Sequence, residues 1–105
     1  MLDQETTNKI NQAVTNVVST HKIILFGSHA YGIPDSESDI DLCIVMNESD
    51  ERKIDRLRKI RRSISDKLPG AFDLLVYDKE EFADRAGLNV TLEYKIANEG
   101  IYIYG

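Results

Sequence analysis

The sequence has one cysteine, two prolines and no tryptophan, and aromatic residues make up 8% of its 105 positions. A single cysteine excludes a disulfide within the chain, which fits a reducing compartment, so we expect a cytoplasmic protein. No apolar run approaches the roughly 20 residues that a membrane-spanning helix needs. Residues 1–5 are acidic and lack the apolar stretch of a signal peptide, so neither a membrane span nor a secretion signal is expected.

Positive charge is also in short supply, because 13 lysines and arginines face 18 aspartates and glutamates and leave a net charge of −5. Direct binding to nucleic acid is therefore not expected, since most of that affinity comes from neutralising phosphates. Most of the basic residues lie in one segment, between Arg52 and Lys67. That segment predicts either a solvated helix face, which is the more common outcome, or a docking surface for an acidic partner or RNA.

The spacing of apolar residues predicts helices and strands that alternate within a single domain over residues 1–105. Helices are expected over residues 3–20, 51–68 and 89–99, with a helical turn at 28–31 and a loop at 32–36. Asp78 and Glu81 would start a further short helix as a capping box, and Gly87 would end it. Strands are expected over residues 22–26, 39–46, 71–77 and 101–104. The predicted class is α/β (α+β), a mixed β-sheet with helices packed against it.

Asp39 and Asp41 are the first candidate site residues. Side chains two apart in a strand share a face, so these carboxylates would project together, about 7 Å apart along the backbone. Two neighbouring carboxylates repel, and a divalent cation removes the conflict. Oxygen ligands suit Mg²⁺, which is commonly held by one or two carboxylates and substrate phosphates. An isolated Asp-x-Asp pair is, however, more often a solvated strand end.

Asp73 is the candidate third carboxylate, because it lies within an apolar strand where a charge needs a partner or a metal. If its strand lies beside the Asp39 strand, three carboxylates converge. Two metal ions about 3.5–4 Å apart could then activate an attacking oxygen and stabilise a leaving one. The alternative is that Asp73 begins its strand near solvent.

Gly27 and Ser28 follow a predicted strand and complete the candidate site. Gly27 permits unusual backbone dihedrals and a close approach of other groups. Ser28 offers a hydroxyl group, and the amides of the following turn can point at a phosphate. No Gly-Lys-Ser/Thr follows, so the pattern is not that of a P-loop.

Residues 25–32 (LFGSHAYG) followed by residues 35–42 (DSESDIDL) resemble the signature of the DNA polymerase β-like nucleotidyltransferase superfamily. The late Phe72-Asp73-Leu74 and the closing stretch of residues 99–105 resemble its minimal nucleotidyltransferase (MNT) branch. The resemblance covers nearly the whole chain. It implies the nucleotidyltransferase fold and the transfer of a nucleotidyl group from ATP to a hydroxyl group, with release of pyrophosphate.

The resemblance also implies roles for the candidate residues. Asp39 and Asp41 would bind Mg²⁺ and the triphosphate, and Asp73 would bind the catalytic metal of a two-ion site and help to deprotonate the acceptor. Gly27 and Ser28 would hold the outer phosphates. Related proteins often have arginine at the positions of His29 and Tyr31, so the contacts that these arginines make are not expected here.

The acceptor is not specified by any residue of the chain. Polymerase and antibiotic-modifying relatives carry a further helical domain that grips it, so we expect a partner or a second copy of the chain to supply it. The chain resembles stand-alone MNT proteins, which are often encoded beside a HEPN-domain toxin and act as its antitoxin. Some of these proteins transfer AMP to a tyrosine of the toxin, which is the function that the resemblance implies here. The alternatives are an antitoxin that masks its partner without catalysis and an enzyme that modifies a small molecule such as an antibiotic.

Overall fold

The computed structural model describes residues 2–32 and 39–105. Helices and strands alternate through this part of the chain: α1 (Gln4–Thr15), β1 (Thr20–Phe26), α2 (Ser28–Tyr31), β2 (Ile40–Met46), α3 (Lys53–Lys67), β3 (Phe72–Asp78), α4 (Lys79–Ala86), α5 (Leu92–Glu99) and β4 (Ile101–Tyr104). None of the helices in these two ranges is long and apolar enough to cross a membrane. The loop predicted over residues 32–36 lies, apart from Gly32, outside the described residues.

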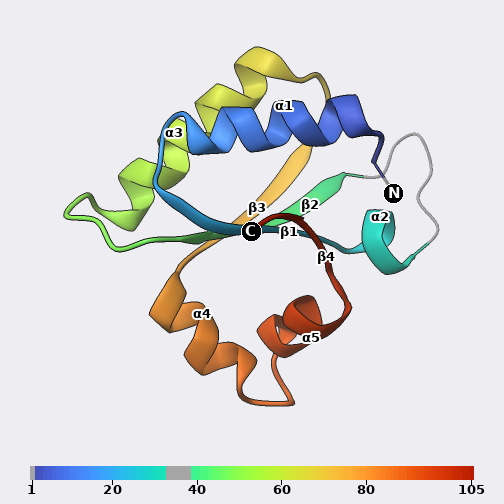
Figure 1. Cartoon of the computed structure of the whole chain (residues 1–105), viewed down its shortest axis with the longest axis vertical. Helices are drawn as coiled ribbons and strands as arrows, with labels where there is room; N and C mark the ends of the chain where they lie inside the picture. The colour runs from blue at the N-terminus through green and yellow to red at the C-terminus, as the bar shows by residue number, and fades with distance from the viewer. Residues whose placement is uncertain (1, 33–38) are drawn as a thin grey trace.

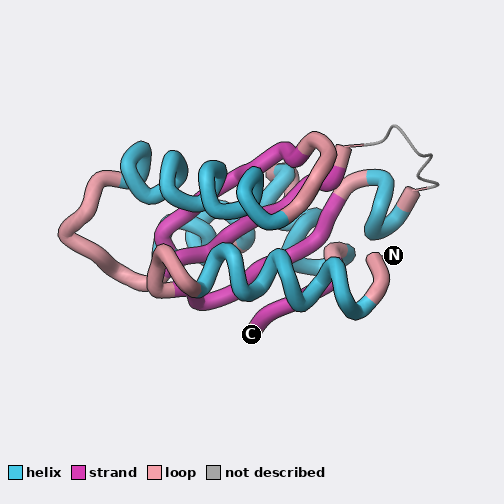
Figure 2. Tube along the Cα trace, turned by 90° about the horizontal axis from the view of Figure 1, so that it is seen from above, coloured by secondary structure: helices cyan, strands magenta, loops and turns pink. Residues whose placement is uncertain are grey.

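A four-stranded sheet with the order β3-β2-β1-β4 forms the middle layer of the fold. β1 runs antiparallel to both β2 and β4, whereas β2 and β3 are parallel. The sheet is therefore mixed, as the sequence predicts. Figure 1 shows α1 and α3 on one face of the sheet and α4 and α5 on the other, with the short α2 at the end of β1. Figure 2 shows the same layers from above.

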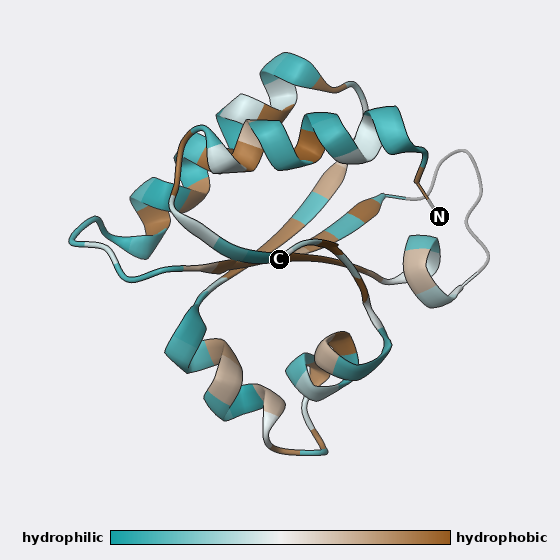
Figure 3. Ribbon diagram, viewed as in Figure 1, coloured by the Kyte–Doolittle hydropathy of each residue, from teal (hydrophilic) through white to brown (hydrophobic). Residues whose placement is uncertain are grey.

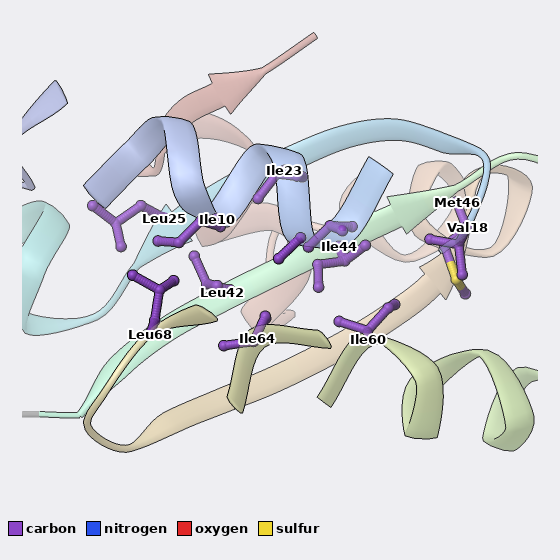
Figure 4. Close-up of a cluster of buried hydrophobic side chains, with 12 residues drawn as sticks. Ile10, Val18, Ile23, Leu25, Leu42, Ile44, Met46, Ile60, Ile64 and Leu68 are labelled. Atoms are coloured by element: carbon purple, nitrogen blue, oxygen red, sulfur yellow. The ribbon is translucent and has the colours of Figure 1, made fainter. Parts of the chain in front are cut away.

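One buried apolar cluster fills the space between the sheet and the α1 and α3 pair (Figure 4). Its fully buried strand residues include Ile23, Leu25 and Ile44, and α1 and α3 contribute Ile10 and Ile60. Burial of one such side chain stabilises the fold by roughly 1.5–3 kcal/mol relative to exposure. This cluster fixes the position of β2, and therefore of the aspartates at its beginning.

A second, smaller cluster lies on the opposite face of the sheet, under α4 and α5. It joins Phe26, Cys43 and Val45 of the strands to Phe82 of α4 and Ile96 of α5. Because helices cover both faces, β2 is apolar along most of its length instead of alternating, and Figure 3 shows this band of apolar strand residues between more polar helices. The prediction that Cys43 is a small buried hydrophobe is confirmed.

Three helices differ from their predicted bounds at the ends, where local hydrogen bonds decide. α1 stops at Thr15, because the chain turns at Asn16 to enter β1, although Val18 still reaches the core. α3 covers 53–67 and stops directly before Leu68. α5 starts only at Leu92, because the side chain of Thr91 caps it by accepting a hydrogen bond from the amide of Tyr94 at 3.0 Å.

The predicted capping box at Asp78 is wrong. Asp78 does precede α4, but its side chain makes no capping hydrogen bond. Instead its Oδ1 accepts a hydrogen bond from Nη1 of Arg56 at 2.9 Å. Arg56 is only 4% exposed, so this arginine of α3 is not part of a solvated basic face. An unpaired buried guanidinium would destabilise the fold more than a missing helix cap, so Asp78 pairs with Arg56 instead of capping α4.

The basic segment of α3 is also less free than its composition suggests. Lys53 pairs with Glu81 at 2.6 Å and Lys59 with Glu51 at 2.7 Å. Ile54, which the apolar spacing places toward the core, is 45% exposed instead, because Arg56 occupies the buried position next to Met46. Much of the helix's charge is therefore neutralised within the molecule.

Candidate functional site

β1 ends in a turn that only glycine adopts readily. Gly27 has φ 72° and ψ −153°, a region of backbone space that is almost exclusive to glycine. Its carbonyl accepts hydrogen bonds from the amides of Ala30 at 3.0 Å and Tyr31 at 3.1 Å. These bonds turn the chain sharply into α2, so that Ser28 becomes the first helical residue directly after the end of β1.

The register of the sheet brings this turn to the aspartates. Phe26, the last residue of β1, pairs with Asp41 of β2, and Asp41 in turn lies opposite Asp73 of β3. A Cβ atom at Gly27 would overlap Oδ2 of Asp41, so the missing side chain is the space that the carboxylate occupies. Gly27, Asp41 and Asp73 therefore lie side by side across three strands, which confirms the expectation that the third strand runs beside the second.

Asp41 is in an environment that disfavours its charge. Its pKa is raised above the usual value, first by partial burial, then by a hydrogen bond with Asp73 and by the negative charges of Asp73 and Asp39. The charge of nearby His29 acts in the opposite direction and is the weakest of these influences. Two carboxyl groups within hydrogen-bonding reach of one another attract protons or cations, so this pair is a place where positive charge is stabilised.

Asp39 is exposed and lies directly before β2. Its charge reaches Asp41, but within residues 2–32 and 39–105 no three His, Cys, Asp or Glu side chains lie close enough together to hold a metal ion. The three carboxylates expected to converge are therefore present as a close pair, Asp41 and Asp73, with Asp39 beside it. In the described parts of the chain, none of these three aspartates forms an ion pair with a lysine or arginine. Carboxylate oxygens without such a partner are suitable ligands for a hard divalent cation.

The family model described as "Polymerase beta, Nucleotidyltransferase" matches residues 8–105, which include the Gly27 turn and all three aspartates. The chain belongs to this nucleotidyltransferase family. Among solved structures, it is similar to the crystal structure of a candidate nucleotidyltransferase from Sulfolobus solfataricus. The two are 20% identical with a TM-score of 0.63, over 93% of this chain and 76% of that one, a likeness that supports the fold. A comparison with curated proteins gives no match.

A polar contact that the sequence does not reveal lies on the same face of β3 as Asp73, toward the other end of the strand. The hydroxyl group of Tyr77 on β3 donates a hydrogen bond to Glu93 of α5 at 3.0 Å, and Arg85 of α4 lies 3.6 Å from the same carboxylate. The pKa of Tyr77 is raised well above its usual value, mainly by burial and next by the hydrogen bond to Glu93. These contacts tie α4 and α5 to the strand that carries Asp73.

Cys43 lies on the same face of β2 as Asp41, and burial raises the pKa of its thiol to about 12. A thiol that stays protonated is a poor nucleophile, so Cys43 is part of the packing beneath the nucleotidyltransferase site.

A hollow of about 490 Å³ lies elsewhere, at the opposite ends of β2 and β3, where Glu48, Asp50 and Asp78 are among its lining residues. Asp41 and Asp73 are not part of it. The candidate site of this family member lies at the other end of these strands, next to Gly27.

The structure adds one residue to the surroundings of this site that no motif indicates. Nζ of Lys95, on α5, lies 4.6 Å from the centre of the Tyr31 ring at the end of α2. The two residues are far apart in the sequence. Lysines are common on exposed helix faces, so the sequence gives no sign that Lys95 is special. Only the packing of α5 beside α2 distinguishes this lysine from the others.

Proposed function

We propose that this protein is a Mg²⁺-dependent nucleotidyltransferase that transfers AMP from ATP to a hydroxyl group. The observation that carries the proposal is the Asp41–Asp73 pair, held across two parallel strands and against the side-chain-free Gly27. The membership of residues 8–105 in the nucleotidyltransferase family supports the reaction class.

In this proposal each residue has a role that follows from its chemistry. Asp39 and Asp41 hold the metal that is bound to the triphosphate, and the turn at Gly27 and Ser28 receives the outer phosphates. Asp73 lies on the acceptor's side, where it orients the attacking hydroxyl group and takes up its proton. Bound Mg²⁺ would supply neutralisation of the charge that develops on the phosphoryl oxygens.

The bond changes are those of an in-line displacement. The acceptor oxygen forms a bond to the α-phosphorus, and the bond between that phosphorus and the bridging oxygen of pyrophosphate breaks. The proton of the acceptor hydroxyl passes to Asp73 and from there to solvent, and pyrophosphate leaves with the electron pair of the broken bond. Most of the rate enhancement in such a reaction comes from positioning and charge stabilisation.

We further propose that the acceptor is a tyrosine of a HEPN-domain toxin, so that the chain acts as an antitoxin. This part rests on the resemblance of the sequence to MNT proteins of that kind. It is separable from the chemistry of the site, because the donor half of the reaction does not depend on the acceptor's identity.

The test is transfer of label from α-³²P-ATP to a HEPN protein encoded beside the gene for this chain. Transfer is expected with Mg²⁺, and it is expected to stop with a chelator or with Asp41→Asn. Asp78→Asn is the matched control, since it alters an aspartate at the other end of β3. Label transfer that persists in Asp41→Asn would overturn the catalytic role of the pair.

Toxicity assays separate catalysis from masking. Neutralisation of the HEPN protein that survives in the doubly substituted Asp39→Asn, Asp41→Asn chain would contradict catalytic neutralisation and favour stoichiometric masking. If the HEPN protein takes no label but aminoglycosides do, the antitoxin part is overturned and a small-molecule acceptor replaces it.

A further inference from the structure

Lys95 of α5 lies over the ring of Tyr31, the last residue of the short helix that Ser28 begins. Its helix, α5, covers the same face of the sheet on which Asp41 and Asp73 lie, because Ile96 packs in one cluster with Phe26 and Cys43. Phe26 pairs with Asp41, and Cys43 is the next residue of β2 on that face. In Figure 1 α2 directly follows the end of β1, and α5 lies below the sheet.

The position of α5 is fixed at its end nearest the site. Gly100 follows the helix, and a Cβ atom at Gly100 would touch the side chain of Ile24 and the carbonyl oxygen of Leu25. The amide of Gly100 donates a 2.9 Å hydrogen bond to the carbonyl of Ile96, which closes the last turn. The end of α5 is therefore held against β1, the strand that pairs with the Asp41 strand.

The ammonium group of Lys95 is held by an aromatic ring and not by a carboxylate. Nζ lies over the Tyr31 ring at 4.6 Å, and in the described part of the chain Lys95 forms no ion pair. Lys9, Lys53 and Lys59, by contrast, each pair with a glutamate. A cation–π contact at an exposed position is weak, so the ammonium group is oriented and still able to move to a stronger anionic partner.

We propose that Lys95 binds the outer phosphates of the nucleoside triphosphate, and that Tyr31 is a positioning residue that holds the ammonium beside the Ser28 turn until the substrate arrives. The inference rests on the proposed function and adds a residue to it. Tyr31 is the last residue of the helix that Ser28 begins, so the ring places the cation at the turn that would receive those phosphates. A flexible ammonium on a four-carbon stem suits a phosphate ligand that must be released after each turnover.

The experiment measures the affinity for a triphosphate and a monophosphate separately. Mg²⁺ with α,β-methylene-ATP, which cannot undergo transfer, and AMP are titrated calorimetrically into the wild-type chain and into Lys95→Gln. A charge-assisted hydrogen bond is worth about 1.5–3 kcal/mol, so Lys95→Gln is expected to weaken triphosphate binding about 10- to 100-fold and to leave AMP binding unchanged. Lys67→Gln, an exposed lysine at the end of α3, is the matched control and should bind both ligands like the wild type.

Tyr31 is tested through its effect on Lys95. Tyr31→Phe keeps the ring and should bind the triphosphate as the wild type does, whereas Tyr31→Leu should weaken it. In the doubly substituted Tyr31→Leu, Lys95→Gln chain no further loss is expected, because the ring acts only through the ammonium. If Tyr31→Leu weakens triphosphate binding by the same factor in the Lys95→Gln chain as in the wild type, the positioning role of Tyr31 is overturned.

The outcomes distinguish this inference from the proposed function. If the wild-type chain does not bind the methylene analogue with Mg²⁺, the proposed function fails and the role of Lys95 fails with it. If the wild type binds it and Lys95→Gln binds it equally well, only the role of Lys95 is overturned. A loss that is equal for the triphosphate and AMP also overturns it, since the outer phosphates would then not be the group that Lys95 contacts.

Discussion

Asp73 and Asp78 stand near opposite ends of β3, and each lies opposite a residue of β2. At the end of the strand, Asp78 meets the guanidinium of Arg56 at 2.9 Å, and Arg56 is almost fully buried. At its beginning, Asp73 meets Asp41, another carboxylate, and in the described residues neither of the two pairs with a lysine or arginine. β3 thus carries an acid paired with an arginine at one end and an acid that faces another carboxylate at the other.

The difference separates a carboxylate that stabilises the fold from one that we propose to have a role in binding and catalysis. An acid that neutralises a buried cation stabilises the folded chain, and its loss is felt as lost stability. Two acids that face each other oppose folding, and such an arrangement persists where a ligand compensates it. The comparison therefore predicts that substitutions at the two ends affect different measurements.

Asp41→Asn is expected to have the largest effect. Removing one charge from the pair should lower nucleotidyl transfer about 100-fold or more, because a ligand of the proposed metal is lost at the point where charge develops. Pyrophosphate release in the presence of the acceptor gives the rate, and circular dichroism shows whether the fold is kept. Full activity in a folded Asp41→Asn chain would contradict the proposed catalytic role of the Asp41–Asp73 pair.

Asp78→Asn is expected to cost stability instead. Arg56 would keep a buried positive charge without its counter-charge, which should lower the free energy of unfolding by about 2 kcal/mol. Urea denaturation measures the loss. Asp55→Asn is the control, because Asp55 pairs only with the exposed Arg52 and Arg58 and should contribute less than about 1 kcal/mol. An Asp78→Asn chain as stable as the control would contradict the structural role of Asp78.

Gly27→Ala is expected to affect both stability and activity. The backbone at Gly27 disfavours any side chain by about 1–2 kcal/mol, and a Cβ atom would also push the Asp41 carboxylate away from its place. Gly70→Ala is the matched control, since Gly70 also has a positive φ of 99° but has no neighbouring atom that a Cβ would meet. Both variants should be destabilised, and only Gly27→Ala should lose transfer activity. Equal activity in the two variants would contradict the role of Gly27 in leaving space for the Asp41 carboxylate.

The smallest expected effect is a pH dependence of stability. Because the pKa of Asp41 is raised in the folded chain, its ionised form disfavours folding, and the penalty appears as the pH rises from the unfolded value of 3.8 through the higher folded value. Asp41→Asn should therefore melt at a slightly higher temperature than the wild type at pH 7, and the difference should vanish below pH 3.8. Mg²⁺ should raise the melting temperature of the wild type alone; a wild type that is the more stable of the two at pH 7 without metal would contradict the sign.

The donor half of the site follows from local sequence. Gly27 and Ser28 follow a strand and form a turn, and Asp39 and Asp41 lie two residues apart where β2 begins, a spacing that predicts a common face. These features depend on residues that are close in the chain, so spacing alone is enough to predict them. The bounds of α1 and α5 were less predictable, because capping by Thr91 and the turn after Thr15 compete with apolar spacing.

Arg56 and Lys95 show where sequence reasoning ends. Both are basic residues on helices; the segment of Arg56 was expected to form a solvated face, and no motif indicated a role for Lys95. The packing of α3 against β3 turned Arg56 into the buried partner of Asp78, and the packing of α5 beside α2 put Lys95 over Tyr31. Nothing local distinguishes these side chains from their exposed neighbours.

The sequence by itself determined the alternation of helices and strands and the glycine turn, because each depends on backbone geometry over a few residues. The tertiary structure decided that Asp73 meets Asp41 while Asp78 meets Arg56. That choice belongs to strand register and helix packing, which bring together residues that are distant in the chain and which no short pattern encodes.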